Sequence, residues 1–312
     1  MVSAQEPIPV MIDSDMTSDD WMAVLYVLNN SNYSVKAITV TGTGFAYCDA
    51  GIRAALGLLA LVEADGIPVS CGAEAPLMGN NAPPSDWRTT LAKVEAAGLP
   101  EGGAAAAEDA VTLFTSVLET SPEKVTVLAL GPLTNIAAAL EAKPELTEKI
   151  EMIYLMGGAV DVPGSRVSDQ NTTAEWNIYS DPHAARLVFE SGAPLTLIPL
   201  DATNAMPVTN AFVSKLEAVK GTPVADFIHT LLLDNQDGID GGYYFLWDQL
   251  AAVVMTHPEL VTITPRELTV IDIPGSPEEG RTKPVANGSQ IFVVTAPDVE
   301  AVEQQLIAGW NS

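Results

Sequence analysis

Four aspartates stand close together near the amino terminus, in the stretch PVMIDSDMTSDDWMAV of residues 9–24. Asp13, Asp15, Asp19 and Asp20 directly follow an apolar run, so folding would hold their negative charges close to one another. Carboxylates that share a site repel one another strongly unless a positive charge lies among them. A hard divalent cation prefers carboxylate oxygens as ligands and would offset this repulsion. The pattern therefore indicates a metal site.

Helix capping is the simplest alternative, because Ser and Asp are common at helix starts. The segment from Ser18 is expected to begin a helix that continues through WMAVLYVL, and capping would account for one or two of the carboxylates but not for four. An EF-hand loop is excluded by spacing. Counted from Asp13, its glycine position holds Ser18 and its final glutamate position holds Val24.

The stretch DSDMT of residues 13–17 also satisfies the DxDxT signature of haloacid-dehalogenase-type phosphatases. In that interpretation Asp13 is a nucleophile and Asp15 an acid/base in magnesium-dependent phosphoryl transfer. The same family needs a downstream lysine and a late acidic GDxxxD-like element, and neither is evident. A magnesium-dependent phosphatase stays open as the alternative.

Short apolar runs alternate with Ala-rich amphipathic segments along the chain. We expect strands at 8–13, 35–41, 67–71, 125–130, 151–156 and 194–200. We expect helices at 50–63, 106–119, 133–142 and 181–191, and further β segments with a final helix near 298–309 after residue 258. This rhythm is typical of an α/β fold with a Rossmann-like, open and mostly parallel sheet covered by helices on both faces. Ligands bind at the carboxyl ends of such strands, where the aspartates lie.

The predicted organisation is a single domain over residues 1–312 with two glycine-rich loops, near 78–102 and 234–247, that could act as lids. Cys48 and Cys71 show neither metal nor redox spacing and are predicted to be core thiols.

The charge balance excludes some partners. With 40 acidic and 14 basic residues, the formal net charge is −26, which repels nucleic acid and anionic lipid. No apolar run is long enough for a membrane span. The start MVSAQEPIPV lacks the features of a signal peptide, so a cytoplasmic protein is expected, with a trimmed secreted form as the alternative.

The opening DSDMTSDD resembles the DxDxxxDD motif of the nucleoside hydrolase family, the inosine/uridine-preferring and purine-specific N-ribohydrolases. Further segments resemble the family in its own order: VTGTGFAYCDAGIRAALGLLAL, IPVSCGAEAPLMG, LALGPLTNIAAAL, IYLMGGAV, AEWNIYSDPHAA, IPLDATN and YYFLWDQLAA. One such motif would be weak, but the ordered set is specific. The resemblance implies a small-molecule nucleoside substrate, N-glycosidic bond hydrolysis, and a homo-oligomer, either a dimer or a tetramer.

The resemblance also implies one bound Ca²⁺. Its protein ligands would be Asp15, Asp20, the main-chain carbonyl of Leu130 and Asp248, an all-oxygen set that suits this ion. Asp13 would orient its neighbours from behind the site.

The implied chemistry is attack of water on the anomeric carbon through an oxocarbenium-like state, with Asp15 taking the proton of the water. Asp19 would hold the ribose 2′-hydroxyl. Glu175 would contact the 5′-hydroxyl, Asn177 the 2′/3′ side, and Asn171 the 5′-hydroxyl as a second contact. A solvated surface carboxylate is the alternative for Glu175.

The base side departs from the pyrimidine-accepting members, many of which place a leaving-group histidine directly before the late aspartate. Trp247 occupies that position here, as in the purine-preferring branch, where tryptophans stack on the base and activate it. Trp87 resembles the second tryptophan of that sandwich. Ordinary packing is the alternative for both, and His183, His229 and His257 are predicted to be structural.

The loop after the second strand also departs from the family. Its usual ribose-contacting asparagine is absent, and TGTGFAYC offers Thr43 or Gly44, with Phe45 where related TGTG sequences have glutamate. A non-catalytic nucleoside-binding protein is a further alternative, which the retained aspartates disfavour.

Overall fold

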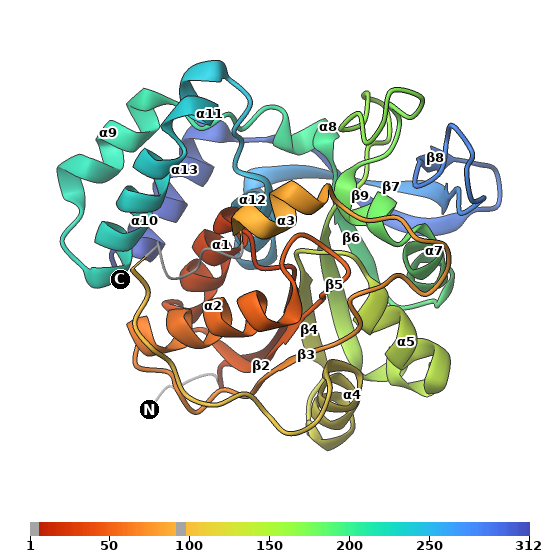
Figure 1. Cartoon of the computed structure of the whole chain (residues 1–312), viewed down its shortest axis with the longest axis horizontal. Helices are drawn as coiled ribbons and strands as arrows, with labels where there is room; N and C mark the ends of the chain where they lie inside the picture. The colour runs from red at the N-terminus through yellow and green to blue at the C-terminus, as the bar shows by residue number, and fades with distance from the viewer. Residues whose placement is uncertain (1–5, 92–97) are drawn as a thin grey trace.

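The computed structural model describes residues 6–91 and 98–312. Within these residues one sheet runs in the order β3-β2-β1-β4-β5-β6-β9-β7-β8 (Figure 1). The strands are β1 Ile8–Ser14, β2 Tyr33–Val40, β3 Val69–Cys71, β4 Val125–Ala129, β5 Ile150–Met156, β6 Leu195–Ile198, β7 Val261–Val270, β8 Thr282–Pro284 and β9 Ser289–Pro297. Neighbours from β3 to β9 in this order pair in parallel, whereas β7 pairs antiparallel with β9 and β8. The predicted α/β fold is confirmed.

Helices cover both faces of the sheet. They are α1 Ser18–Leu28, α2 Cys48–Leu61, α3 Ser85–Leu91, α4 Ala110–Thr120, α5 Thr134–Ala142, α6 Trp176–Ser180, α7 Pro182–Glu190, α8 Leu200–Thr203, α9 Asn210–Val219, α10 Pro223–Asp234, α11 Gln236–Gly241, α12 Trp247–Thr256 and α13 Val299–Trp310, with the 3-10 turns η2 Pro144–Lys149 and η3 Pro258–Leu260. Figure 1 shows α4, α5 and α7 on one side and α1, α2, α12 and α13 on the other.

Strand β1 is apolar from Ile8 to Ile12 because both of its faces are covered. Val10 and Ile12 join the core beneath α1 and α12, whereas Met11 joins the core beneath α4 and α5. All three side chains are fully buried, as expected of a strand inside a parallel sheet, and polar residues appear only at its carboxyl end, at Asp13 and Ser14.

The position of β1 explains where a ligand can bind. It lies between β2 and β4, and the chain crosses from one half of the sheet to the other at this point. Asp13 pairs with Thr39 of β2 and with Ala129 of β4, so the residues after it enter the crevice between the strand ends.

The predicted helices correspond to α2, α4, α5 and α7, and the predicted C-terminal elements to β7, β9 and α13. The prediction of a loop over residues 234–247 is wrong in part, because α11 lies within this range. Gly238 and Gly241 argue against a helix there, but Asp240 accepts hydrogen bonds from Asn210 and Gln236 and holds this short helix against α9. The 78–102 loop contains α3, and residues 92–97 lie outside the described residues.

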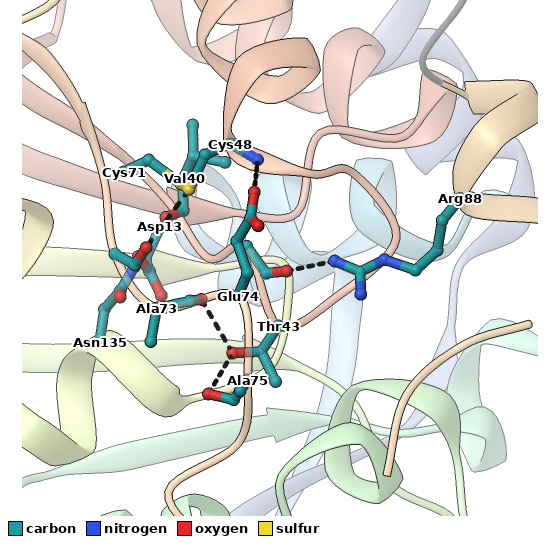
Figure 2. Close-up of a disulfide and its surroundings, with 12 residues drawn as sticks. Asp13, Val40, Thr43, Cys48, Cys71, Ala73, Glu74, Ala75, Arg88 and Asn135 are labelled. Carbon is teal, nitrogen blue, oxygen red and sulfur yellow. Dashed lines mark hydrogen bonds between the residues drawn. A yellow bond between two sulfur atoms is a disulfide. The ribbon is translucent and has the colours of Figure 1, made fainter. Parts of the chain in front are cut away.

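The prediction of two free core thiols is wrong. Cys48 begins α2, Cys71 ends β3, and the two form a disulfide with Cα atoms 5.6 Å apart (Figure 2). Both residues are partly exposed rather than buried in the core. A spacing of 23 residues contains no pairing signal, because only the β2–α2–β3 connection brings the two ends together.

No helix in the described parts of the chain is both long and apolar enough to cross a membrane.

Candidate active site

A cavity of about 380 Å³ opens at the carboxyl ends of β1, β4 and β5. It brings together most of the residues singled out from the sequence, although they are distant along the chain. Those that line it are Asp15, Asp19, Asp20, Trp87, Leu130, Glu175, Asn177, Trp247 and Asp248.

Four carboxylates line this cavity and form what we call the acidic floor: Asp15, Asp19, Asp20 and Asp248. Oxygens of Asp19, Asp20 and Asp248 all lie within 4.8 Å of one another, a spacing that one metal ion could bridge. Asp15, Asp20 and Asp248 are each at most 2% exposed. The floor forms because α1, which carries Asp19 and Asp20, packs against α12, which begins at Trp247 and carries Asp248.

Asp20 serves as a helix cap as well as a floor residue. Its Oδ2 accepts the Thr17 backbone N–H at 3.0 Å and the Thr17 hydroxyl at 2.7 Å, while its Oδ1 accepts the Ser14 hydroxyl. Capping therefore explains Asp20 but leaves Asp15 and Asp248 without such a reason.

Met16, between β1 and α1, has φ of 57°, a left-handed conformation that is costly for a non-glycine residue and turns the chain sharply beside Asp15.

Asp15 is enclosed by backbone on two sides. Its Oδ2 accepts the Phe45 N–H at 2.9 Å, and its own carbonyl accepts the Ala46 N–H at 3.0 Å. A Cβ at Gly44 would lie 2.2 Å from Asp15 Oδ2, and one at Gly131 would lie 2.8 Å from the Asp15 nitrogen. Glycine at these two positions lets the loops after β2 and β4 approach Asp15 this closely.

The electrostatics of the floor match the repulsion expected from the sequence. Burial raises the pKa of Asp15 and of Asp248, and the neighbouring Asp20 charge raises both further. Burial, with the Asp20 charge, also raises the pKa of Asp19 to about 7. Holding all of these groups ionised without a counter-ion is costly, so the site favours a bound cation.

The donor set fits a hard dication. Besides the floor carboxylates, the Leu130 residue lines the cavity and is 1% exposed. Its carbonyl accepts the Asn177 side-chain N–H at 3.1 Å, which uses one of two lone pairs and leaves one for a metal. An all-oxygen set of this kind is the preference of Ca²⁺.

Glu175 and Asn177 are buried at the start of α6. Glu175 is 5% exposed, so the alternative of a solvated surface carboxylate is wrong. Its carboxylate caps α6 by accepting the N–H of Asn177. It also accepts the N–H of Gly158 from the loop after β5. Burial raises the pKa of Glu175, and these N–H donors counteract part of that effect. Asn177 also donates to the Met156 carbonyl at 3.1 Å, which ties the ends of β4 and β5 together.

Asp13 lies behind the cavity. It is fully buried, and its Oδ1 accepts the Thr39 hydroxyl at 2.6 Å and the Asn135 side-chain N–H at 2.8 Å. Burial raises its pKa to about 7, with these two hydrogen bonds opposing the rise. The carboxylate connects β1, β2 and α5 beneath the floor, as expected of a residue that orients its neighbours.

Two predicted contacts do not line the cavity. The Asn171 side chain donates to the Glu279 carbonyl at 2.7 Å and accepts the Thr173 N–H at 3.1 Å. The Thr43 hydroxyl donates to the Ala73 carbonyl at 3.2 Å. Each therefore fixes a loop near the cavity in this structure.

Aromatic rings in two groups also line the cavity. Phe45, Trp87 and Trp176 form what we call the aromatic wall, in which Phe45 and Trp87 stack with centroids 6.0 Å apart and Trp87 meets Trp176 edge-on at 5.6 Å. Trp247 and Tyr244 form the second group, with ring centroids 5.7 Å apart.

Sequence reasoning missed Phe45, Trp176 and Tyr244 as lining residues. Phe45 was visible only as a departure from the family glutamate, and Trp176 only as a neighbour of Glu175. None of the three histidines lines the cavity. His183 pairs with Asp272 at 3.0 Å, and His229 is buried on α10, in keeping with structural roles.

An open, mostly parallel sheet with carboxylates and aromatic rings clustered at its strand ends is typical of an α/β protein that binds a cation and a small ligand there. Comparison with known proteins shows the family to which the chain belongs. The chain belongs to the inosine-uridine preferring nucleoside hydrolase family, whose model matches residues 10–304. Its fold and its activity class, hydrolysis of the N-glycosidic bond of ribonucleosides, follow from that membership.

Relatives and solved structures agree with this assignment. The chain is 34% identical over 267 residues to the pyrimidine-specific ribonucleoside hydrolase RihA of Klebsiella pneumoniae subsp. pneumoniae, covering 83% of each chain. It resembles the purine-preferring ribonucleoside hydrolase structure from Gardnerella vaginalis, with a TM-score of 0.83, 25% identity and coverage of 97% and 98%. An inosine-uridine preferring nucleoside hydrolase from Bacillus anthracis has the same fold, with a TM-score of 0.86, 23% identity and coverage of 97% and 99%.

Because the chain is a ribonucleoside hydrolase, the two alternative functions are not supported. The DSDMT stretch is the start of the nucleoside hydrolase motif rather than a phosphatase signature, and the protein is an enzyme rather than only a nucleoside-binding protein.

Proposed function

We propose that this protein is a calcium-dependent, purine-preferring nucleoside hydrolase that releases free base and ribose. The observation that carries the proposal is the composition of one cavity, which is lined both by the carboxylates of the acidic floor and by the rings of Trp87 and Trp247. A nucleoside combines the matching groups, a hydroxyl-rich sugar and an aromatic base.

Calcium would be held by Asp15, Asp20, Asp248 and the Leu130 carbonyl. The raised pKa values of the floor carboxylates and their oxygen-only chemistry support this choice. When bound, the ion would make a water more acidic and would attract the ribose hydroxyls. Asp19 lies within reach of the same ligand cluster, and its proposed partner is the ribose 2′-hydroxyl.

The residues of the chain would divide the reaction between them. Asp15 takes the proton of the attacking water, and its Phe45 N–H contact keeps the carboxylate oriented while it does so. Glu175 accepts a hydrogen bond from the 5′-hydroxyl, so that its carboxylate lies near the positive charge that develops on the ribose. The neutral amide of Asn177 grips the 2′/3′ side.

The leaving base would stack on Trp247, which stands where pyrimidine-accepting members carry a histidine. The absence of any histidine among the described residues that line the cavity supports a purine, because a purine can be activated by stacking and by taking up a proton itself. The RihA relative is named for pyrimidines, whereas the Gardnerella structure is named for purines. A tryptophan at position 247, in place of the histidine of pyrimidine-accepting members, favours the purine preference.

A reducing-sugar assay over inosine, adenosine, guanosine, uridine and cytidine tests the proposal. We expect ribose release from the purine nucleosides, lost when a chelator is added and restored by Ca²⁺. Faster release from uridine and cytidine would contradict the purine preference, and activity that survives chelation would contradict the calcium site.

We further propose that the protein acts as a homo-oligomer, in the first instance a homodimer, on a small-molecule nucleoside and not on nucleic acid or a membrane. Light scattering coupled to size-exclusion chromatography measures the assembly directly. A monomeric mass with full activity would contradict the proposal.

The disulfide bears on the compartment. A cytoplasmic location was expected from the sequence, but disulfides form and persist mainly in oxidising compartments. This feature favours the secreted alternative. Trapping free thiols in intact cells by alkylation would decide between the two, because a cytoplasmic protein should present Cys48 and Cys71 as reduced thiols.

A further inference from the structure

The aromatic wall is assembled from two separate segments. Phe45 belongs to the loop of residues 41–47 between β2 and α2, whereas Trp87 belongs to the short helix α3. Their rings stack at 6.0 Å with an interplanar angle of 10°. Trp87 is nevertheless 46% exposed, so burial alone cannot hold it at the cavity.

The residue after Trp87 fastens α3 to that loop. Arg88 is only 4% exposed, which is unusual for an arginine on a short surface helix. Its Nη2 donates to the Gly42 carbonyl, and its guanidinium lies 3.7 Å from the centre of the Tyr47 ring (Figure 2 shows the side chain reaching the loop). Gly42 and Tyr47 flank Phe45 in sequence, so Arg88 grips the loop on both sides of the stacked ring.

The loop itself is fixed from the opposite direction. The Thr43 hydroxyl donates to the carbonyls of Ala73 and Ala75, and the Cys48 N–H donates to Glu74 Oε1 at 2.8 Å (Figure 2). The Cys48–Cys71 disulfide joins the same two segments covalently. Arg88 therefore binds a loop that is itself held in place, so contacts from this one side chain can help to fix the position of α3.

We propose that Arg88 is a positioning residue that holds Trp87 against Phe45, so that the two rings act as one surface for the leaving base. This inference rests on the base-stacking role proposed above for Trp87. Arg88 does not line the cavity, so it acts through the wall and touches neither the sugar nor the reacting atoms.

The geometry predicts which kinetic constants change. Loss of the Arg88 contacts with Gly42 and Tyr47 would let Trp87 move away from the nucleobase, which weakens nucleoside binding. The acidic floor and its contacts with the sugar would stay intact. The KM for inosine should rise about fivefold, a typical effect of one lost cation–π or stacking contact. The inhibition constant of free ribose, which has no base, should stay within about twofold.

The primary variant is Arg88→Met, which keeps the aliphatic stem but removes the donors and the charge. Tyr47→Leu removes the ring under the guanidinium at a position that is 37% exposed, so it tests the same dock with little risk to folding. Arg53→Met, at an exposed position on α2, is the matched control and should leave both constants unchanged. Melting temperatures of all three variants monitor folding.

A double-mutant cycle with Trp87→Ala separates positioning from a general structural role. If Arg88 acts through Trp87, then Arg88→Met adds no more than about twofold to the KM of a chain that already carries Trp87→Ala. Additive effects of the two substitutions would overturn the proposal. A ribose inhibition constant that rises in parallel with the KM for inosine would overturn it as well.

The outcomes also distinguish this inference from the proposed function. Wild-type protein that releases ribose from inosine and loses nucleoside affinity on Trp87→Ala, but is indifferent to Arg88→Met, refutes the Arg88 role alone. Indifference to Trp87→Ala refutes the stacking role and the inference together.

Discussion

The acidic floor and the aromatic wall line one cavity, and they differ in burial and in how they are held. The floor carboxylates Asp15 and Asp20 are at most 2% exposed; Asp20 accepts hydrogen bonds from nearby Thr17, and Asp15 accepts one from the Phe45 N–H in the loop between β2 and α2. In the wall, Trp87 is 46% exposed and is held by side-chain contacts between segments distant in sequence. The floor is therefore a buried, hydrogen-bonded cluster, whereas the wall is partly exposed and depends on how two segments dock.

This difference suggests a division of labour. Chemistry at the anomeric carbon requires charges fixed to within fractions of an ångström, which a buried and capped turn can provide. Selection among bases requires a surface that can differ from one enzyme to another, which a docked helix can provide. We expect changes in the floor to lower the rate steeply and changes in the wall to affect substrate choice.

The largest expected effect comes from the floor. Asp15→Asn removes the proposed base while keeping the acceptor for the Phe45 N–H, and kcat for inosine should fall by about 10²–10⁴-fold. Stopped assays of ribose release measure the rate, with the melting temperature as the folding control. A loss smaller than about tenfold would place the base elsewhere and would remove the main distinction between floor and wall.

The second prediction concerns stability without metal. Burial raises the pKa of Asp13 and Asp19 to about 7 in the folded protein, from 3.8 for an ordinary aspartate. Between about pH 4 and about pH 7 the unfolded chain releases these protons while the folded protein keeps them. The free energy of unfolding therefore has its full contribution from these groups below about pH 4 and loses it as the pH rises through about 7. The melting temperature of the metal-free protein should therefore fall as the pH rises from about 4 to about 7.

Calcium should reverse that loss, increasingly so as the pH rises and the carboxylates ionise. Melting temperatures with chelator and with Ca²⁺ at about pH 4.5, 6 and 7.5 measure the difference. Asp248→Asn is the matched variant and should respond less to Ca²⁺. Equal stabilisation by Ca²⁺ at every pH would show that the floor is not where the ion binds.

A smaller effect is expected from Trp247, which lines the cavity outside the aromatic wall. Trp247→Ala should lower kcat/KM for inosine about tenfold, since one aromatic contact and its activation of the base are lost. A riboside with a strongly activated leaving group needs no such help and should lose much less. Equal losses on both substrates would mean that Trp247 only fills space.

The smallest effect is expected from the disulfide beneath the wall. Replacing both cysteines, Cys48→Ala with Cys71→Ala, should raise the KM for inosine about two- to threefold with kcat little changed, because the loop that carries Phe45 keeps its hydrogen bonds to Ala73 and Glu74. Steady-state kinetics in the absence of reductant measure this. A large fall in kcat instead would show that the loop supports Asp15 more than the wall.

The part of the floor that follows β1 could be predicted from the sequence because it is short-range. The apolar run of β1 predicted a buried strand, and the position of Asp15 just beyond Ser14 placed it in the crevice. Asp248 could be assigned only through the family resemblance, since nothing local shows that α12 packs against α1.

The wall could be predicted only in part. Trp87 was recognised by its resemblance to a family tryptophan, but its stacking partner was expected to be the base and Trp247, and Phe45 was missed. Ring stacking between segments depends on how α3 docks, and no periodicity or spacing encodes that. For the same reason the sequence suggested neither the Cys48–Cys71 disulfide nor the use of the Asn171 side chain to hold Glu279.

The packing of α12 against α1 has a consequence for how the protein is made. Asp15, Asp19 and Asp20 leave the ribosome early, whereas Asp248 emerges only after most of the chain has been synthesised. A nascent chain therefore carries three mutually repelling charges without Asp248, and tight capture of the proposed calcium ion would have to await the nearly finished polypeptide. Ion uptake would then mark the end of biogenesis, distinguishing completed molecules from truncated ones.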